Sequence, residues 1–316
     1  MGTPDFAVPP LLELIKHHQV VAVLTQPDRP SGRGHKLTPS PVKVAALEHG
    51  IKVLQPQSLT IKKVDDGNNH IAKEHRICLK EMDADIFVVA AYGLILPKAV
   101  LGIPTYGSIN IHGSILPKYR GASPIHAALL NGDDKTGITI MDMDVGIDTG
   151  DMILKKEISI LPGDRFMSLH DKLSTLGAEC IIEAVDLIAK GNATRTPQNH
   201  NKSCYAPMIK KSDGLINWND TSQVIINKLR ALDMWPSIYF MYNGQQVKVR
   251  GLEICNDTKW EGSLPGTILT AASNDGLIIK TADNAVKITE IQPSGKKPMA
   301  IADYLRGAKV EVGLVL

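Results

Sequence analysis

Aromatic residues, cysteines and long apolar runs are all scarce in this sequence of 316 residues. The four cysteines, Cys78, Cys180, Cys204 and Cys255, are scattered without CxxC spacing. We therefore expect neither structural disulfides nor a zinc site, and no pattern in the chain requires a metal. No apolar stretch approaches the ~20 residues that span a bilayer, and the first residues lack the pattern of a signal peptide. Together these absences favour a cytoplasmic protein.

The chain also lacks the glycine patterns that bind nucleotide phosphates. Neither GxGxxG nor GxxxxGK[ST] follows a predicted strand, which argues against a dinucleotide-dependent dehydrogenase. The net charge of +2 is too small to indicate a nucleic-acid partner by itself. What is present is an ordinary balance of 43% hydrophobic and 22% charged residues, in a chain long enough for two domains.

Two polar residues at the end of a predicted strand are the first candidates for chemistry. Residues 107–112 alternate in the manner of a short strand, so Asn110 and His112 leave it on the same face. A turn at Gly113 and a loop rich in small residues follow, an arrangement that suits an active site in an open α/β sheet. The spacing alone leaves a second interpretation open, because such pairs more often make structural hydrogen bonds.

A third polar group follows in a glycine-flanked loop. Asp148 lies between Gly146 and Gly150, where it and nearby acids could also be plain loop residues or calcium ligands. The spacing is not that of an EF-hand, since no glutamate stands at the twelfth position. With this loop, the chain resembles the formyltransferases that use 10-formyltetrahydrofolate. The resemblance rests on three motifs in the same order: Asn110-x-His112, Ser114–Gly121 and Asp148–Asp151.

The resemblance implies a fold class and a division of the chain. It implies an α/β protein with an N-terminal doubly wound, mostly parallel, Rossmann-like sheet and a small C-terminal β-barrel of the OB type. We expect the catalytic domain at 1–195 and the C-terminal domain at 213–316. Residues 196–212 are expected to be a linker, because a proline and several polar residues there break the periodicity. Short strands separated by turns agree with the last assignment and are expected at 246–251, 266–269, 276–281 and 286–291.

The implied reaction is formyl transfer from 10-formyltetrahydrofolate to the α-amine of methionyl initiator tRNA, for translation initiation. In this reaction Asn110 would donate a hydrogen bond to the developing oxyanion, and protonated His112 would add positive charge there. Asp148 would hold His112 in its charged form and help to accept the proton of the amine. We expect the enzyme to act as a monomer without a metal.

The same resemblance implies where the folate co-substrate binds. Backbone groups after a buried strand would read the edge of the pterin, while apolar side chains pack on its face. The folate-binding residues implied in this way are Ser114, Ile115, Leu116 and Pro117, together with Tyr92, Gly93, Leu94, Ile95 and Leu96.

Residues 26–41 form a long segment without periodicity, rich in glycine, proline and basic residues. By themselves they fit either a basic surface loop without function or an arm for an anionic partner. The stretch Gln26–Gly34 resembles the formyltransferases that act on methionyl-tRNA, which favours the arm. It implies tRNA contacts by Arg33, Arg29 and Lys36, with His35 at a position where a lysine is expected.

Four further features lead to structural expectations. The resembled family begins with a strand before Gly2 for which this sequence has no residues. Its absence would leave a gap lined by unpaired backbone groups, so either the given start is truncated or misassigned, or another segment fills the slot. Residues 59–82 are interpreted as a surface insertion without assigned function. His126 is expected to be packed or at the surface rather than a second base. Arg120 is expected to hold loop backbone, with substrate contact as the alternative.

Two C-terminal features are also open to two interpretations. Trp235 is expected in the core rather than as a stacking platform for a base. Lys296 and Lys297 could contact phosphate or simply flank a turn.

Two rival functions share part of this pattern. A formyltransferase acting on glycinamide ribonucleotide or on an amino sugar would use the same three polar residues, but it leaves Gln26–Gly34 unexplained. A tRNA-binding protein with an inactive transferase domain would explain the basic loop. The complete set of Asn110, His112 and Asp148 argues against that second rival.

Overall fold

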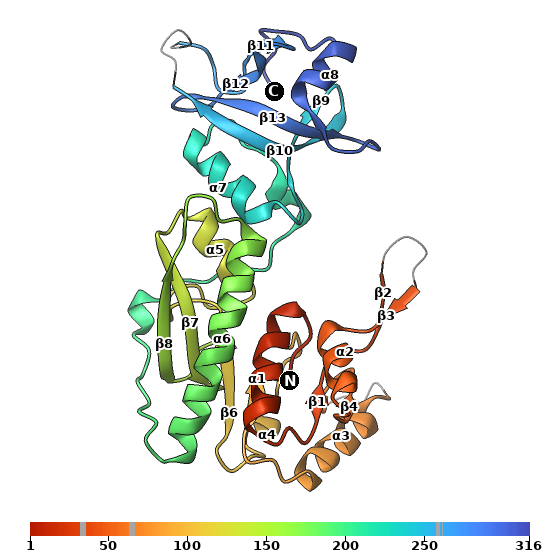
Figure 1. The fold of residues 1–316 in the computed structure, drawn as a ribbon, viewed down its shortest axis with the longest axis vertical. Helices are drawn as coiled ribbons and strands as arrows, with labels where there is room; N and C mark the ends of the chain where they lie inside the picture. Colours follow the sequence, from red (N-terminus) through yellow and green to blue (C-terminus); the bar gives the residue numbers. More distant parts are fainter. Residues whose placement is uncertain (32–35, 63–66, 257–259, 261) are drawn as a thin grey trace. The chain divides into compact units, whose positions relative to one another are not determined.

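The structure is a computed structural model that describes residues 1–31, 36–62, 67–256, 260 and 262–316 (Figure 1). It divides into two compact units. The first comprises Met1–Pro124, Lys135–Ser159 and Leu169–Ala206, and the second comprises Ile125–Asp134, Ile160–Ser168 and Pro207–Leu316. Because the second unit takes two segments from the middle of the chain, the units do not follow linear boundaries. The domain limits expected from the sequence stay a prediction.

The sheets of the first unit agree with the predicted α/β class. Besides the hairpin described below, β1 (Val23–Leu24) pairs with β4 (Val53–Leu54). A four-stranded sheet has the order β5 (Phe87–Val89), β6 (Ser108–His112), β7 (Lys135–Asp142) and β8 (Met152–Ser159). The pairs β1–β4 and β5–β6 are parallel, whereas β7 is antiparallel to both β6 and β8. The central strands β6 and β7 are mostly buried, as expected for strands covered on both faces.

Several helices pack around the strands of the first unit. They are η1 (Asp5–Ala7), α1 (Val8–His17), α2 (Pro41–Glu48), α3 (Asn69–Glu81), α4 (Lys98–Leu101) and most of α6 (Phe166–Ala189). The apolar residues from Arg165 to about Lys190 recur with helical spacing, which predicts a helix there. That prediction is confirmed by α6, which lies beside β6 (Figure 1). Gly177 permits the close approach, because a Cβ there would lie 3.0 Å from the Ile111 side chain. The Ser174 hydroxyl also donates to the Phe6 carbonyl at 2.8 Å, which joins α6 to η1.

Residues 59–82 are not merely a surface insertion, so that expectation was wrong. Leu59 and Leu79 are fully or almost fully buried and belong to one apolar cluster with Phe87 of β5. Within α3, Ala72 and Leu79 face inward while charged residues occupy the other side. A helix needs only a narrow apolar stripe to pack against a core. The mostly polar composition of residues 59–82 therefore did not indicate that α3 has a buried side.

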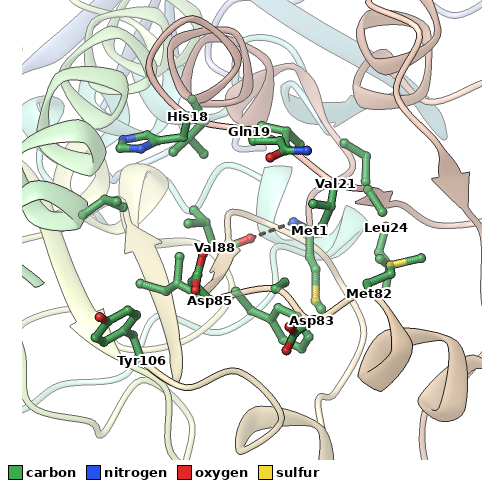
Figure 2. Close-up of a pocket in the computed structure, with 18 of the residues that line it drawn as sticks. Met1, His18, Gln19, Val21, Leu24, Met82, Asp83, Asp85, Val88 and Tyr106 are labelled. Atoms are coloured by element: carbon green, nitrogen blue, oxygen red, sulfur yellow. Dashed lines mark hydrogen bonds between the residues drawn. The ribbon is translucent and has the colours of Figure 1, made fainter. Parts of the chain in front are cut away.

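A cavity of about 550 Å³ lies between β1 and β5, where the sequence predicted a gap in the sheet (Figure 2). Met1 closes one end of it: the Met1 amine donates to the Val88 carbonyl at 2.7 Å, and the Ala90 amide donates to the Met1 carbonyl at 2.9 Å. The Gly2 amide donates to Leu24 on the other side at 2.9 Å.

The predicted basic arm contains a short antiparallel hairpin, β2 (Arg29–Ser31) with β3 (Lys36–Thr38). Its base is tied to α2, since the Lys43 ammonium donates to Asp28 at 2.7 and 2.9 Å. That hydrogen bond lowers the pKa of the Asp28 carboxyl, so the pair is ionised at neutral pH. Arg33 lies outside the described residues.

The second unit is built on one six-stranded antiparallel sheet, with order β11-β12-β13-β10-β9 and β14 paired to β13. Its strands are β9 (Ile238–Tyr242), β10 (Gln245–Cys255), β11 (Ile268–Ala272), β12 (Gly276–Lys280), β13 (Ala285–Pro293) and β14 (Met299–Ala300). Its helices are α5 (Pro124–Leu130), α7 (Ser222–Leu232), α8 (Ile301–Gly307) and the short η3 (Lys211–Gly214), while η2 (His200–Lys202) belongs to the first unit. The four strands predicted in this region are therefore confirmed as β10 to β13.

Trp235 is 55% exposed, so the expectation that it belongs to the core was wrong. The core position is taken by Trp218, which is 5% exposed and meets Phe240 edge-on with ring centroids 6.0 Å apart. His126 stacks on Phe166 with ring centroids 4.1 Å apart, as expected for a packed histidine. Among the described residues, no helix combines the length and apolar character needed to cross a membrane.

Candidate active site

Strand β6 presents the first two candidate residues. It pairs with β7 so that Asn110 lies opposite Met141 and His112 lies opposite Thr139. Both side chains leave the strand on one face because they are two residues apart. His112 is 5% exposed and Asn110 is half-buried. Within the described part of the chain the Asn110 side chain has no hydrogen-bond partner, so its amide is available to a ligand.

The ring of His112 is held between a carbonyl and a carboxylate. Nε2 lies 2.9 Å from the Tyr119 carbonyl oxygen, which can only accept, so Nε2 carries a proton. Nδ1 lies 3.6 Å from Oδ2 of Asp148, and both side chains are largely buried. A second ring proton would therefore face a carboxylate.

The loop that carries Asp148 has a constrained backbone. Asp148 itself adopts a positive φ of 51°, and its Oδ2 accepts a hydrogen bond from the Gly121 amide at 2.7 Å. Gly150 has no room for a side chain, since a Cβ there would lie 1.8 Å from the Asp142 carbonyl oxygen. The glycines that flank Asp148 in the sequence thus allow the loop to turn back on β7 and aim the carboxylate at β6.

The predicted folate loop, Ser114–Pro117, is fixed from β7. The Thr139 hydroxyl donates to the Ser114 carbonyl at 2.7 Å and accepts from the Leu116 amide at 3.1 Å. Ser114 is fully buried and donates to the Lys118 carbonyl at 2.6 Å. The Leu116 side chain packs in the core with Met141 and Met152. Ile115 and Pro117 are half-buried, so they and the backbone are the parts of this loop open to a ligand.

The second predicted folate segment, residues 92–96, is divided between core and surface. Tyr92 and Leu96 are buried in the apolar cluster that includes Leu59, and Leu94 packs against it. Ile95 is 85% exposed. The backbone turns through Gly93, which has a positive φ of 77° and lies against the Gln26 side chain. The exposed Ile95, the half-buried Leu94 and the backbone are therefore the parts of this segment open to a ligand.

The predicted tRNA contacts lie away from β6 along the chain, on the hairpin. Arg29 is exposed at the start of β2, and its guanidinium donates to the Gln26 side chain at 2.5 Å. Lys36 begins β3. The prediction for Arg33 falls on a residue that is not described.

The sequence analysis missed Gln198, which the structure places beside Asp148. We assigned it to a linker because the surrounding residues break periodicity. Its side-chain NH₂ donates to the carbonyls of Asp148 and Gly150 at 2.9 and 2.8 Å. Its side-chain oxygen accepts from Arg120 at 2.7 and 3.0 Å. Arg120 thus holds loop structure, which was the first of its two expected roles. The only signal for Gln198 in the sequence was a polar residue within a segment that breaks periodicity.

In the described ranges, no group of three or more histidine, cysteine, aspartate or glutamate residues is arranged to hold a metal ion. Asp148, the acid that faces the candidate site, is occupied by the Gly121 amide and the His112 ring. The polar groups of Asn110, His112 and Asp148 suit charge stabilisation and proton transfer.

Comparison with known proteins identifies two family regions. Residues 1–185 match the family described as "Formyl transferase", and residues 208–309 match "Formyl transferase, C-terminal domain". The chain is 46% identical over 317 aligned residues to methionyl-tRNA formyltransferase of Geobacter metallireducens, covering 100% of this chain and 97% of that protein. It is 44% identical to the enzyme of the same name from Alkaliphilus metalliredigens, covering 100% and 96%.

Solved structures share the fold at lower identity. An N-formyltransferase from Helicobacter canadensis, solved with folinic acid and dTDP-3-aminofucose, superposes with a TM-score of 0.63 at 21% identity. That match covers 92% of this chain and 97% of the other. HypX from Aquifex aeolicus, solved with tetrahydrofolic acid, gives a TM-score of 0.56 at 18% identity, covering 85% of this chain and 47% of that one.

Proposed function

Since the chain belongs to the formyl transferase family, we propose that it transfers a formyl group from 10-formyltetrahydrofolate to the α-amine of methionyl initiator tRNA. The observation that carries this proposal is the 46% identity, over essentially the full length of both chains, to a methionyl-tRNA formyltransferase. The product, N-formylmethionyl-tRNA, would serve translation initiation in the cytoplasm.

The candidate residues have the chemistry that this transfer needs. The amine nitrogen attacks the formyl carbon, a C–N bond forms, and the carbonyl oxygen becomes an oxyanion. The unpartnered Asn110 amide donates to that oxyanion, and the His112 ring adds charge beside it. Asp148 faces Nδ1 of His112 and takes part in accepting the proton that the amine loses. The C–N bond to the folate then breaks, and the folate nitrogen is protonated.

The co-substrate would bind against the two loops described above. The backbone of residues 92–96, Ile95 and the backbone of Ser114–Pro117 offer a mixture of fixed polar groups and apolar surface. Such a mixture suits a flat heteroaromatic ring. The relatives solved with folinic acid or tetrahydrofolic acid share the fold and are consistent with this assignment.

The tRNA would be bound by the hairpin of β2 and β3 and by the second unit, with a single copy of the chain sufficient for activity. Arg29, Arg33 and Lys36 are the proposed contacts to the acceptor end. The ion pair between Lys43 and Asp28 at the base of the hairpin would keep the arm attached to α2 while its basic residues meet phosphates.

The test is formyl transfer to three acceptors assayed in parallel. Methionyl initiator tRNA, glycinamide ribonucleotide and an amino sugar nucleotide would each be incubated with the protein and 10-formyltetrahydrofolate. We expect transfer to the tRNA alone. Transfer to a small acceptor instead would reject the tRNA assignment while keeping the transferase. Binding of tRNA without any transfer would identify the inactive tRNA-binding rival.

A further inference from the structure

The segment 196–206, named the strap here, belongs to the first unit, and the hydrogen bonds given below join it to other residues of that unit. At its start, the backbones of Thr196 and Met152 exchange two hydrogen bonds of 2.9 Å. At its end, Arg120 donates its amide to the Cys204 carbonyl at 2.9 Å and accepts from the Ala206 amide at 2.6 Å. The strap therefore joins the start of β8 to the loop that follows His112.

Gln198, in the middle of the strap, uses the whole capacity of its carboxamide. The two N–H groups bind the carbonyls of Asp148 and Gly150, and the oxygen takes two hydrogen bonds from Arg120. A carboxamide has two donors and two acceptor sites, so all are used. Gln198 is 5% exposed and Arg120 is 8% exposed, so these bonds are shielded from competing water.

The position of this carboxamide matters because the Asp148 backbone is unusual. Asp148 has a positive φ, which is unfavourable for a residue with a side chain and persists only where its surroundings enforce it. The Gly121 amide holds the carboxylate, and Gln198 holds the carbonyl of the same residue. Gly121 and Arg120, the hydrogen-bond partner of Gln198, belong to the same loop as Tyr119. The carbonyl of Tyr119 accepts the hydrogen bond from His112.

We propose that Gln198 is a positioning residue for formyl transfer, which locks the Asp148 loop to Arg120 and so sets the Asp148 carboxylate against Nδ1 of His112. This inference rests on the proposed function, because it assigns Gln198 a task in that reaction. Gln198 does not touch the reacting atoms and acts only through Asp148. This positioning role explains why a buried polar residue lies in a segment that otherwise has the composition of a linker.

The decisive variant is Gln198→Glu. A carboxylate still accepts from Arg120 and gains an ion pair with it, but it cannot donate to the two loop carbonyls. The strap should therefore stay in place while the Asp148 loop is released. The matched control is Asn199→Asp, the same amide-to-acid change at the next residue, which is exposed and keeps its acceptor for the Asn201 amide.

Two readouts separate positioning from folding. In formyl-transfer assays we expect Gln198→Glu to lower kcat at least tenfold, with KM for both substrates within about twofold of the unaltered protein. Loss of the two buried hydrogen bonds should lower Tm by only a few degrees, so that the variant stays folded at the assay temperature. In hydrogen exchange followed by mass spectrometry, we expect faster exchange in residues 144–151 than in the unaltered protein. Asn199→Asp should change neither readout.

Three outcomes would overturn the proposal. They are a kcat for Gln198→Glu within twofold of the unaltered protein, unchanged exchange in residues 144–151, or a variant that is already unfolded at the assay temperature. The exchange measurement does not depend on catalysis. An unaltered protein that transfers no formyl group would therefore reject the proposed function, while the exchange data would still decide whether Gln198 holds the loop.

Discussion

Single polar side chains carry the proposed chemistry, and each has a distinct local reason for its position. Asn110 is positioned by β6 and is left without a partner among the described residues. His112 is oriented by a backbone carbonyl, and Asp148 is held by an amide on a loop that glycine allows to turn sharply. The first of these side chains is free to meet substrate, while the other two form an ordered pair.

Removal of the Asn110 amide should affect catalysis and leave stability unchanged. Asn110→Ala deletes the proposed oxyanion donor, and one such donor is typically worth ~2.7–4 kcal/mol, or about 10²–10³ in kcat. Because the side chain makes no hydrogen bond in the described structure, we expect Tm to shift by no more than a few degrees. Steady-state kinetics and thermal melting provide the check. A kcat above one third of the original would remove Asn110 from the mechanism.

The charge of Asp148 should matter more than its shape. Asp148→Asn keeps an oxygen for the Gly121 amide but removes the negative charge opposite His112. We expect kcat to fall roughly 10²–10⁴-fold, the range for loss of a group active in proton transfer. Asp151→Asn changes the neighbouring acid of the same loop and should leave kcat within about twofold. Equal effects of the two substitutions would contradict a specific role for Asp148.

At the scale of elements, short segments bring distant residues together. The β6–β7 register places Thr139 opposite His112, and its hydroxyl holds the folate loop. The strap 196–206 ties this loop to that of Asp148. The hairpin of β2 and β3 stands apart from these contacts and is anchored through Asp28 and Lys43.

The hairpin should contribute to tRNA binding and not to the chemical step. Arg29→Ala and Arg33→Ala should each raise KM for methionyl-tRNA roughly fivefold, equivalent to about 1 kcal/mol, with kcat and KM for the folate unchanged. Lys16→Ala is the matched control, since Lys16 is an exposed cation that pairs with Glu13 on α1. A rise in KM for the folate, or an equal effect of Lys16→Ala, would reject the hairpin as the tRNA arm.

At the scale of the whole molecule, charge is nearly balanced, with 35 basic and 33 acidic residues. A chain with this balance has no strong overall field, so tRNA affinity must come from local cations such as those of the hairpin. Binding of the small folate co-substrate should depend much less on such cations.

Salt should therefore separate the two substrates. If three hairpin cations contact phosphates, KM for methionyl-tRNA should rise about 40-fold between about 50 and 200 mM monovalent salt. KM for the folate should change by less than about threefold over that range. Steady-state assays at four salt concentrations would measure both slopes. If KM for methionyl-tRNA does not change with salt concentration, phosphate contacts do not support its binding. That result would favour a small acceptor.

Much of this protein follows from the sequence itself. The two-residue period of a strand puts Asn110 and His112 on one face, and the helical period of residues 165–190 predicts the buried side of α6. These patterns are local, because they depend on backbone geometry that any chain obeys. The order of the motifs was enough to identify the family before any contact was known.

Only the tertiary structure decided the rest. In the structure, Oδ2 of Asp148 lies 3.6 Å from Nδ1 of His112. Gln198, which the sequence assigned to a linker, binds both Arg120 and the Asp148 loop. Leu59 and Leu79 are buried although their segment has a polar composition. The tertiary structure also left Trp235 exposed and gave the core position to Trp218. These outcomes depend on packing between residues far apart in the chain and on a loop backbone with positive φ, which local periodicity does not encode.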